Sequence, residues 1–429
     1  GSNPSFSASP QAERSVGIFL SPTEHHTILT PILHKIGFGG PSSTQEPYLN
    51  ATEPPHKHIP GPAYVLGALL FSRICFWALA QYKGVPFVEG LCRWDCGWYI
   101  QLASNGYDLL PHTNPRGDAA NWAFFPLYPL VMAVLNFVSG MPHRLASIVV
   151  SNVAMFFAIL ISLKYLAQSR HKVAGHFWVW LCVMGPYSFY FSSGYSEALF
   201  WLLACAALLA WQNKQFITTG WLTAALCATR LFGLFWLLGY LVDLWHKRHS
   251  RPLGAHLRNP SLVLGLTLCP LGLALFAGYL YWHLGDALAF SHVQIAWDRS
   301  LGSSLVNWKN TLQQWNDFEF LWAKIPQSRY AHAYFNVFFL VGLLLAGNLI
   351  IQKRWLESSI AICVFMTAFL AGAMSLPRFL VGSLVFAFSF HDVIARYIHP
   401  KVQAPLLGAL FLFNLWLLSN WYDVAFFLV

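Results

Sequence analysis

The sequence has 429 residues, of which 56% are hydrophobic and 10% are charged. This composition excludes an ordinary soluble protein and predicts an all-α, polytopic membrane protein, because long apolar runs recur over most of the chain. The net charge of +9 comes from short basic clusters between these runs. Such clusters are typical of topology signals and lipid headgroup contacts, so we expect membrane lipids as partners and no nucleic acid.

Two parts are predicted along the chain. Residues 1–60 are rich in Pro, Ser, His and Gly and have no sustained periodicity, so a mostly irregular N-terminal extension is expected there. Residues 61–429 form the predicted transmembrane domain. Its apolar runs cover 62–82, 122–138, 145–166, 173–191, 196–211, 216–245, 261–284, 330–351, 358–374, 377–395 and 405–427.

The basic clusters predict how these runs cross the membrane. All four are expected on the cytoplasmic side, at 164–172, 246–251, 352–354 and 396–401. About eleven crossings achieve this if the proline-containing run 122–138 lies on the outer surface and the run 216–245 is broken near Arg230. The outer loops 83–143 and 285–329 then face the non-cytoplasmic side and carry the candidate site.

The first outer loop contains the segment RWDCGWYIQLASNGY, which combines aromatic residues with a single carboxylate, Asp95. Read as a helix, it places Trp94, Trp98 and Leu102 in one apolar stripe, with Asp95 about 100° away beside Tyr99. A short aromatic amphipathic helix suits a membrane–water boundary. Two interpretations stay open: Asp95 lies at the entrance of a membrane cavity, or it caps a surface helix.

Cys92 and Cys96 lie in this same loop. A disulfide between them requires that the loop face an oxidising compartment. Neighbouring turns of one helix also orient two cysteines poorly for bonding, so we expect the pair to be unbonded.

Three further charged residues are candidates for the site. Glu197 is expected in the first turn of a helix, where it either stabilises the helix dipole or contributes to a cavity. Arg230 is a lone cation in an apolar stretch, for which binding an anion is the default expectation. Arg378 lies near a helix end, where it either binds an anion or extends to the lipid headgroups.

The second outer loop offers hydrogen-bond donors and an aromatic face for a sugar or a phosphate, through His292, Gln294, Trp297, Asp298 and Arg299. A solvated amphipathic helix is the alternative interpretation of this segment. The chain has no motif for zinc-dependent, nucleotide-hydrolysing or dinucleotide chemistry, so neither a metal nor a cofactor is expected.

Taken in order, these segments resemble the PIG-V type mannosyltransferases of the glycosyltransferase-C superfamily. The resemblance runs from about Gly61 to the C-terminus. It rests on Trp-Asp-x-x-x-Tyr…Gly-Tyr (94–107), Ala-Phe-Phe-Pro-x-Tyr-Pro (123–129), Pro…Tyr-Ser-Glu (186–197), Thr-Arg…Gly (229–233), Gln…Trp…Arg (294–299) and Pro-Arg (377–378). Two features depart from the family pattern: the bulky Leu231-Phe232 spacer, and the N-terminal 60 residues.

The resemblance implies transfer of a mannosyl group, with inversion, from a polyprenyl- or dolichyl-phosphate carrier to a hydroxyl of a lipid or glycan acceptor. Asp95 would be the general base. Arg230 and Arg378 are expected to hold the carrier phosphate, with Glu197 and Tyr99 as further polar contacts. The chain is similar to compact bacterial members, which implies an inner membrane with the site facing the periplasm. The endoplasmic reticulum membrane, with the site facing the lumen, is the alternative.

Two other functions fit the same sequence: a lipid-linked sugar transporter or flippase without chemistry, and a helical scaffold. A transporter should have polar residues along its whole depth and two related halves. The polar motifs instead gather on one predicted face and no internal repeat is visible, which favours the enzyme.

Overall fold

The computed structural model describes residues 59–111, 119–169, 174–248, 252–297, 299–313, 332–372 and 375–425, together with residue 428. Within these residues the chain is helical and contains no β-strand, which confirms the predicted all-α fold class. The predicted irregular extension lies almost wholly outside the described residues, as does the second outer loop from residue 314 onwards.

Five spans among the described helices are long and apolar enough to cross a bilayer. They are α1 (Pro62–Tyr82), α5 (His143–Gln168), α11 (Pro260–Leu268) continued by α12 (Leu271–Leu284), α15 (His332–Ile351) and α19 (Pro400–Tyr422). The pair α17 (Leu376–Gly382) and α18 (Leu384–Tyr397) is bent by 77° and adds a sixth candidate. The predicted count of eleven crossings is therefore not confirmed.

Shorter apolar helices account for most of the difference. They are α4 (Leu127–Ser139), α6 (Gly175–Met184), α7 (Glu197–Gln212), α8 (Phe216–Thr229) and α16 (Trp355–Ala371). Helices of 10 to 17 residues fall short of the roughly 20 residues that a straight span needs. Such helices are tolerated at membrane depth where they are packed in protein or line a cavity.

The run 216–245 is broken where the sequence predicts it. Helix α8 ends at Thr229, Arg230 is extended, and α9 (Leu234–Lys247) begins after the 3-10 turn Leu231–Gly233. Gly233 permits this break, because a Cβ atom there would come within 2.4 Å of the backbone nitrogen of Cys227. The break therefore places a cation at the junction of two short helices.

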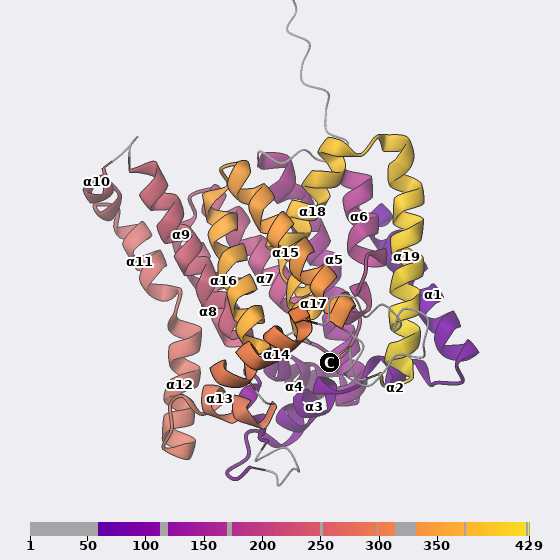
Figure 1. Ribbon diagram of the computed structural model, residues 1–429. Coiled ribbons are helices and arrows are strands. Elements are labelled where there is room, and N and C mark those ends of the chain that lie inside the picture. Colours follow the sequence, from indigo (N-terminus) through magenta and orange to yellow (C-terminus); the bar gives the residue numbers. More distant parts are fainter. Residues whose placement is uncertain are drawn as a thin grey trace, which may run out of the picture. The chain divides into compact units, whose positions relative to one another are not determined.

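The candidate segments gather at one end of the helical domain (Figure 1). Helices α2 (Phe87–Leu91), α3 (Asp95–Asn105), α4 and α13 (Ala289–His292) lie at the lower end of the view. The basic C-terminal end of α9, helix α10 (Leu253–Leu257) and the turn between α18 and α19 lie at the upper end. Helix α14 (Leu301–Gln313) follows the described part of the second outer loop.

A buried ionic network stabilises the C-terminal half of α18. The carboxylate of Asp392, which is fully buried, accepts hydrogen bonds from Gln352 at 2.8 Å, Arg354 at 3.2 Å and Arg396 at 2.7 Å. Because Gln352 and Arg354 belong to the turn between α15 and α16, this network ties that turn to α18. It fixes the helix that continues, through the 77° bend, into α17.

Candidate functional site

A cavity of about 390 Å³ lies where the two outer loops meet the junction of α8 and α9 and the start of α17. Its wall is formed by Asp95, Tyr99, Ala123, Phe124, Phe125, Thr229, Arg230, Leu231, Phe232, Phe290, Ser291, Gln294, Trp297, Arg299, Thr367, Leu370, Ala371, Arg378 and Phe379. Seven of the nine predicted site residues are among them. The two that are not, Glu197 and His292, are described below.

Helix α3 differs from the predicted helix in where it begins. Trp94 lies outside the helix in a strained conformation, with φ 48° and ψ −112°, and Asp95 is the first helical residue. Trp98 and Leu102 of the predicted stripe lie in the helix, whereas the prediction that Trp94 belongs to it is wrong. The buried residues of α3 are Cys96, Tyr99 and Leu102. The sequence pattern assumed one continuous helix, whereas the chain turns a corner just before Asp95.

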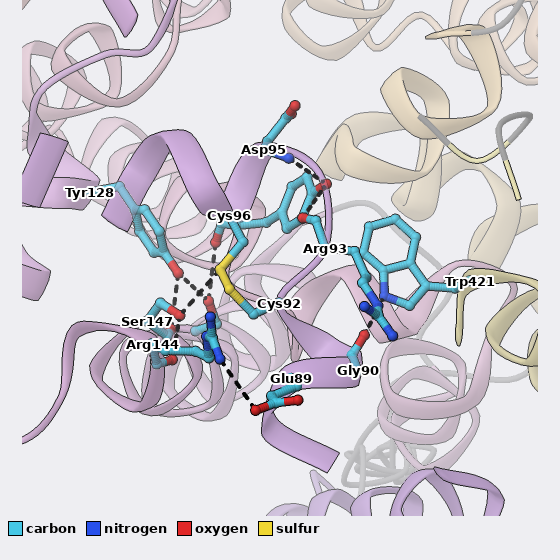
Figure 2. Close-up of a disulfide and its surroundings, with 12 residues drawn as sticks. Glu89, Gly90, Cys92, Arg93, Asp95, Cys96, Tyr128, Arg144, Ser147 and Trp421 are labelled. Atoms are coloured by element: carbon cyan, nitrogen blue, oxygen red, sulfur yellow. Dashed lines mark hydrogen bonds and ion pairs between the residues drawn. A yellow bond between two sulfur atoms is a disulfide. The ribbon is translucent and has the colours of Figure 1, made fainter. Parts of the chain in front are cut away.

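A disulfide joins Cys92 to Cys96, with the Cα atoms 5.2 Å apart (Figure 2). The expectation of an unbonded pair is therefore wrong. It assumed that both cysteines lie on neighbouring turns of one helix. Instead Cys92 is the C-cap residue that follows α2, and Cys96 lies in the first turn of α3. The corner between the two helices therefore brings the cysteine side chains together.

Four charged side chains form an alternating chain beside the cavity. One nitrogen of Arg378 lies 2.8 Å from Oδ2 of Asp95, and its Nε lies 2.9 Å from Oε1 of Glu197. The same Oε1 also lies 2.7 Å from Arg230. Asp95 is the first residue of α3. Its carboxylate meets a cation from α17.

Glu197 lies behind the cavity wall. It is the first residue of α7, its side chain is 1% exposed, and it contacts the two arginines from the protein side. It compensates their positive charge at a depth where an uncompensated ion is costly. The carboxylate therefore holds Arg230 and Arg378 and does not itself line the cavity.

The second outer loop contributes a third cation. Arg299 donates one hydrogen bond to Oε1 of Gln294 at 2.9 Å and another to Ser375, at the start of α17, at 3.5 Å. Burial lowers the pKa of Arg299, and the nearby Asp95 carboxylate opposes this shift. Among the described residues, three guanidinium groups and one carboxylate thus line this cavity.

Aromatic rings, among them Phe124 and Trp297, also line the cavity. Trp98 stacks on Phe124 with ring centroids 5.8 Å apart, and Trp297 meets Phe124 edge-to-face at 6.2 Å. The hydroxyl of Tyr99 is hydrogen-bonded to Ser196 at 3.0 Å. Burial raises the pKa of Tyr99 to about 12, so this hydroxyl keeps its proton at physiological pH.

His292 is the predicted site residue that the structure leaves apart from this wall. Its side chain is 65% exposed, and Nδ1 lies 2.7 Å from Oδ2 of Asp286. The hydrogen bond from His292 lowers the pKa of Asp286. A role for His292 in donor binding stays a prediction.

Tyr195 is a site residue that the sequence analysis missed. Its hydroxyl accepts a hydrogen bond from the backbone N–H of Asp95 at 3.2 Å and donates one to the backbone oxygen of Arg93 at 3.2 Å. The Arg378 guanidinium lies 4.7 Å from the centre of the same ring. The sequence signal was its place in the Tyr-Ser-Glu motif, two residues before Glu197, which named no role for it.

Polar side chains of the first outer loop bind its backbone and that of α5. Tyr107 donates to the backbone oxygen of Phe124 at 2.7 Å, and Asn121 donates to that of Gly106 at 3.1 Å. Tyr128 reaches α5, where it donates to the backbone oxygen of Ser147 at 2.9 Å. The Gly-Tyr and Phe-Phe-Pro segments therefore shape the cavity entrance through backbone contacts.

Comparison with known proteins identifies the family of the chain. The family described as "Mannosyltransferase (PIG-V)" matches residues 67–285. GPI mannosyltransferase 2 of Yarrowia lipolytica is 25% identical over 201 residues, which cover 46% of this chain and 52% of that protein. The chain thus matches about half the length of this relative. No solved structure matches the chain. Since the family match extends over half of the sequence, the chain belongs to the PIG-V mannosyltransferase family.

Proposed function

We propose that this protein transfers a mannosyl group from a polyprenyl- or dolichyl-phosphate carrier to a hydroxyl of a lipid or glycan acceptor, with inversion at the anomeric carbon. One observation carries the proposal: among the described residues of the cavity wall, one carboxylate, that of Asp95, lies with three arginine side chains. Membership of the PIG-V family supports the mannosyl group. A lipid-borne donor fits a site formed by short helices in a membrane protein.

The arginines are proposed to bind the phosphate of the carrier. Arg230 and Arg378 are the principal ligands, and Arg299 is the third cation. A guanidinium group binds phosphate oxygens through paired hydrogen bonds, which a lysine cannot do. Before the donor enters, Glu197 keeps Arg230 and Arg378 in place through contacts of 2.7 and 2.9 Å. The anion-binding groups are therefore ordered in advance, which lowers the entropic cost of binding.

Asp95 is proposed as the general base. Its Oδ2 atom pairs with Arg378, whereas Oδ1 makes no hydrogen bond to any described residue. An acceptor hydroxyl can donate to Oδ1 while Arg378 fixes the carboxylate. An alcohol is a poor nucleophile until its proton is removed, and a positioned base contributes about 10²- to 10⁴-fold.

A single carboxylate is sufficient for this reaction. As the bond from the acceptor oxygen to the anomeric carbon forms, the bond from that carbon to the phosphate oxygen breaks, and the acceptor proton moves to Asp95. The departing phosphate is a stable anion, so no acid is needed to protonate it. Direct displacement by the acceptor inverts the anomeric carbon.

The site is proposed to face the non-cytoplasmic side. Helix α3, which begins at Asp95, lies at the end of the helical domain opposite the C-terminal ends of α9 and α18 (Figure 1). Those two ends carry basic residues, which favour the cytoplasm. The disulfide between Cys92 and Cys96 gives independent support, because disulfides persist in oxidising compartments. Periplasm and endoplasmic reticulum lumen both satisfy this condition, and the periplasm is proposed.

One experiment tests the transfer directly. Purified protein is incubated with polyprenyl-phosphate-mannose carrying a radiolabelled sugar and with a membrane lipid extract, and lipids are separated after quenching. We expect label to leave the carrier and to appear in a new mannosylated product. If label stays on the carrier at every donor concentration, mannosyl transfer is contradicted. Movement of intact carrier across vesicles without a new product would favour the transporter.

A further inference from the structure

The corner between α2 and α3 holds a disulfide that the proposed reaction does not use. Cys92 and Cys96 enclose only Arg93, Trp94 and Asp95 between them. We infer that this disulfide is a positioning device for Asp95, which keeps the carboxylate against Arg378 at the cavity wall. The inference rests on the proposed function, since it assigns the disulfide a part in that reaction.

The backbone of this corner is strained at Trp94. Trp94 has φ 48°, a conformation that costs free energy for a bulky side chain, and no side chain caps the start of α3. Such a conformation persists only where the surrounding structure fixes it. The disulfide restrains the corner covalently on one side. Tyr195 restrains it on the other, by hydrogen bonds to the backbone of Arg93 and Asp95.

The disulfide also lies against the segment that carries the second carboxylate. Cys96 is fully buried, and its sulfur lies 3.8 Å from the Ser147 hydroxyl of α5. Gly194 faces the same sulfur so closely that a Cβ atom there would come within 2.3 Å of it. Gly194 precedes Glu197 by three residues, so both carboxylates that contact Arg378 lie next to this junction.

The geometry indicates a local rather than a global role. A loop of five residues is short, so the cross-link removes little entropy from the unfolded chain. Helix α2 is also held by other contacts, including a hydrogen bond of 2.9 Å from Trp421 to the backbone oxygen of Gly90 (Figure 2). In the same view the Asp95 side chain points away from the disulfide, so the bond acts on the backbone that carries the carboxylate.

The test compares the double variant Cys92→Ala/Cys96→Ala with wild type and with Cys75→Ala, which removes a free cysteine from α1. We expect the double variant to lose about 10²-fold in kcat, the cost of misplacing a reacting group by about 1 Å, with carrier Kd within about threefold. Cys75→Ala should retain wild-type kcat. Dithiothreitol should reproduce the loss in wild type and in Cys75→Ala, which both contain the disulfide, and should cause no further loss in the double variant. The reagent is oxidised to its cyclic disulfide, and the two protein sulfurs take up two electrons and two protons.

A double-mutant cycle separates positioning from general destabilisation. If the disulfide acts through Asp95, its removal should cause no further loss in an Asp95→Asn background, whereas independent effects multiply. Multiplying losses, or a double variant as active as wild type, would overturn the inference while leaving the transferase function in place. Alkylation of both cysteines by N-ethylmaleimide in the unreduced protein would overturn it too. If the wild-type protein transfers no mannosyl group, the proposed function is contradicted. The inference then fails as well, because it assigns the disulfide a part in that reaction.

Discussion

Arg378 is the residue that joins the site together. It comes from α17, yet it contacts Asp95 from the first outer loop and Glu197 from the start of α7. The sequence marks each of these residues, because isolated charges in an apolar chain are conspicuous. It does not reveal that they meet. Pairing across more than 180 positions depends on how helices pack, and neither spacing nor composition encodes it.

Glu197→Gln is expected to destabilise the fold as well as the site. The change removes the buried anion shared by Arg230 and Arg378, and losing one partner of such a pair costs about 3–5 kcal/mol. Thermal unfolding in detergent should show a clear decrease in Tm. The matched control is Glu89→Gln, whose partner Arg144 lies 3.5 Å away at the surface and whose loss should cost at most about 1 kcal/mol. Equal Tm values for the two variants would rule out a structural role for Glu197.

Arg230→Lys tests the phosphate site. Lysine retains the charge but not the paired hydrogen bonds, so the Kd for the carrier should rise about tenfold, a change of 1.4 kcal/mol. Arg258→Lys is the control, because Arg258 is an exposed arginine beyond α9. Binding of fluorescent polyprenyl phosphate provides the measurement. Unchanged affinity in a well-folded Arg230→Lys protein would remove Arg230 from the anion site.

At the scale of elements, a helix break marked by a charged residue and a glycine in an apolar run could be predicted from the sequence. The sharp turn of the backbone before α3 could not. The interruption between α8 and α9 was expected from Arg230 and Gly233 in an apolar run. The corner at Trp94 was not, because a tryptophan with positive φ has no sequence signature. Its consequence was to shift the buried face of α3 and to permit the disulfide.

Helix packing around α8 gives a prediction of its own. The backbones of α8 and α11 approach so closely that a Cβ atom on Gly265 would come within 2.2 Å of the backbone oxygen of Phe216. Gly265→Ala should therefore destabilise by about 1–3 kcal/mol through overpacking. Gly278→Ala, in the same apolar span, meets nothing within 4 Å and should be neutral or stabilising. The measurement is the Tm of both variants. An unchanged Tm in Gly265→Ala would contradict the close approach of α8 and α11.

At the scale of the whole molecule, the fold class followed from composition, and the number of crossings did not. Hydropathy identifies apolar runs, but it cannot tell a full span from a short helix that lines a cavity. The run 377–395 illustrates this difference, since it divides into α17 and α18 with a bend of 77°. That bend gives Arg378 its place beside the first outer loop. The site therefore depends on a deviation from the simplest membrane topology.

Accessibility labelling tests which end of the domain faces outward. In a variant without free cysteines that keeps the disulfide, Asn105→Cys is introduced in α3 and Arg258→Cys after α10, both at exposed positions. An impermeant maleimide applied to intact bacterial cells should label position 105 and reach position 258 only after lysis. The opposite pattern would place the cavity in the cytoplasm, where the basic turns are expected.

The most direct test of the account is the turnover of Asp95→Asn. Asparagine keeps the size and the hydrogen-bonding capacity of the side chain but cannot accept the proton of the acceptor hydroxyl. We expect turnover with labelled polyprenyl-phosphate-mannose to fall by about 10²- to 10⁴-fold, while carrier binding and Tm show that the site is still formed. Asp95→Glu should be nearly as impaired, because one methylene displaces the carboxylate by about 1 Å. Near wild-type turnover in Asp95→Asn would contradict Asp95 as the base and leave the central claim without its catalytic group.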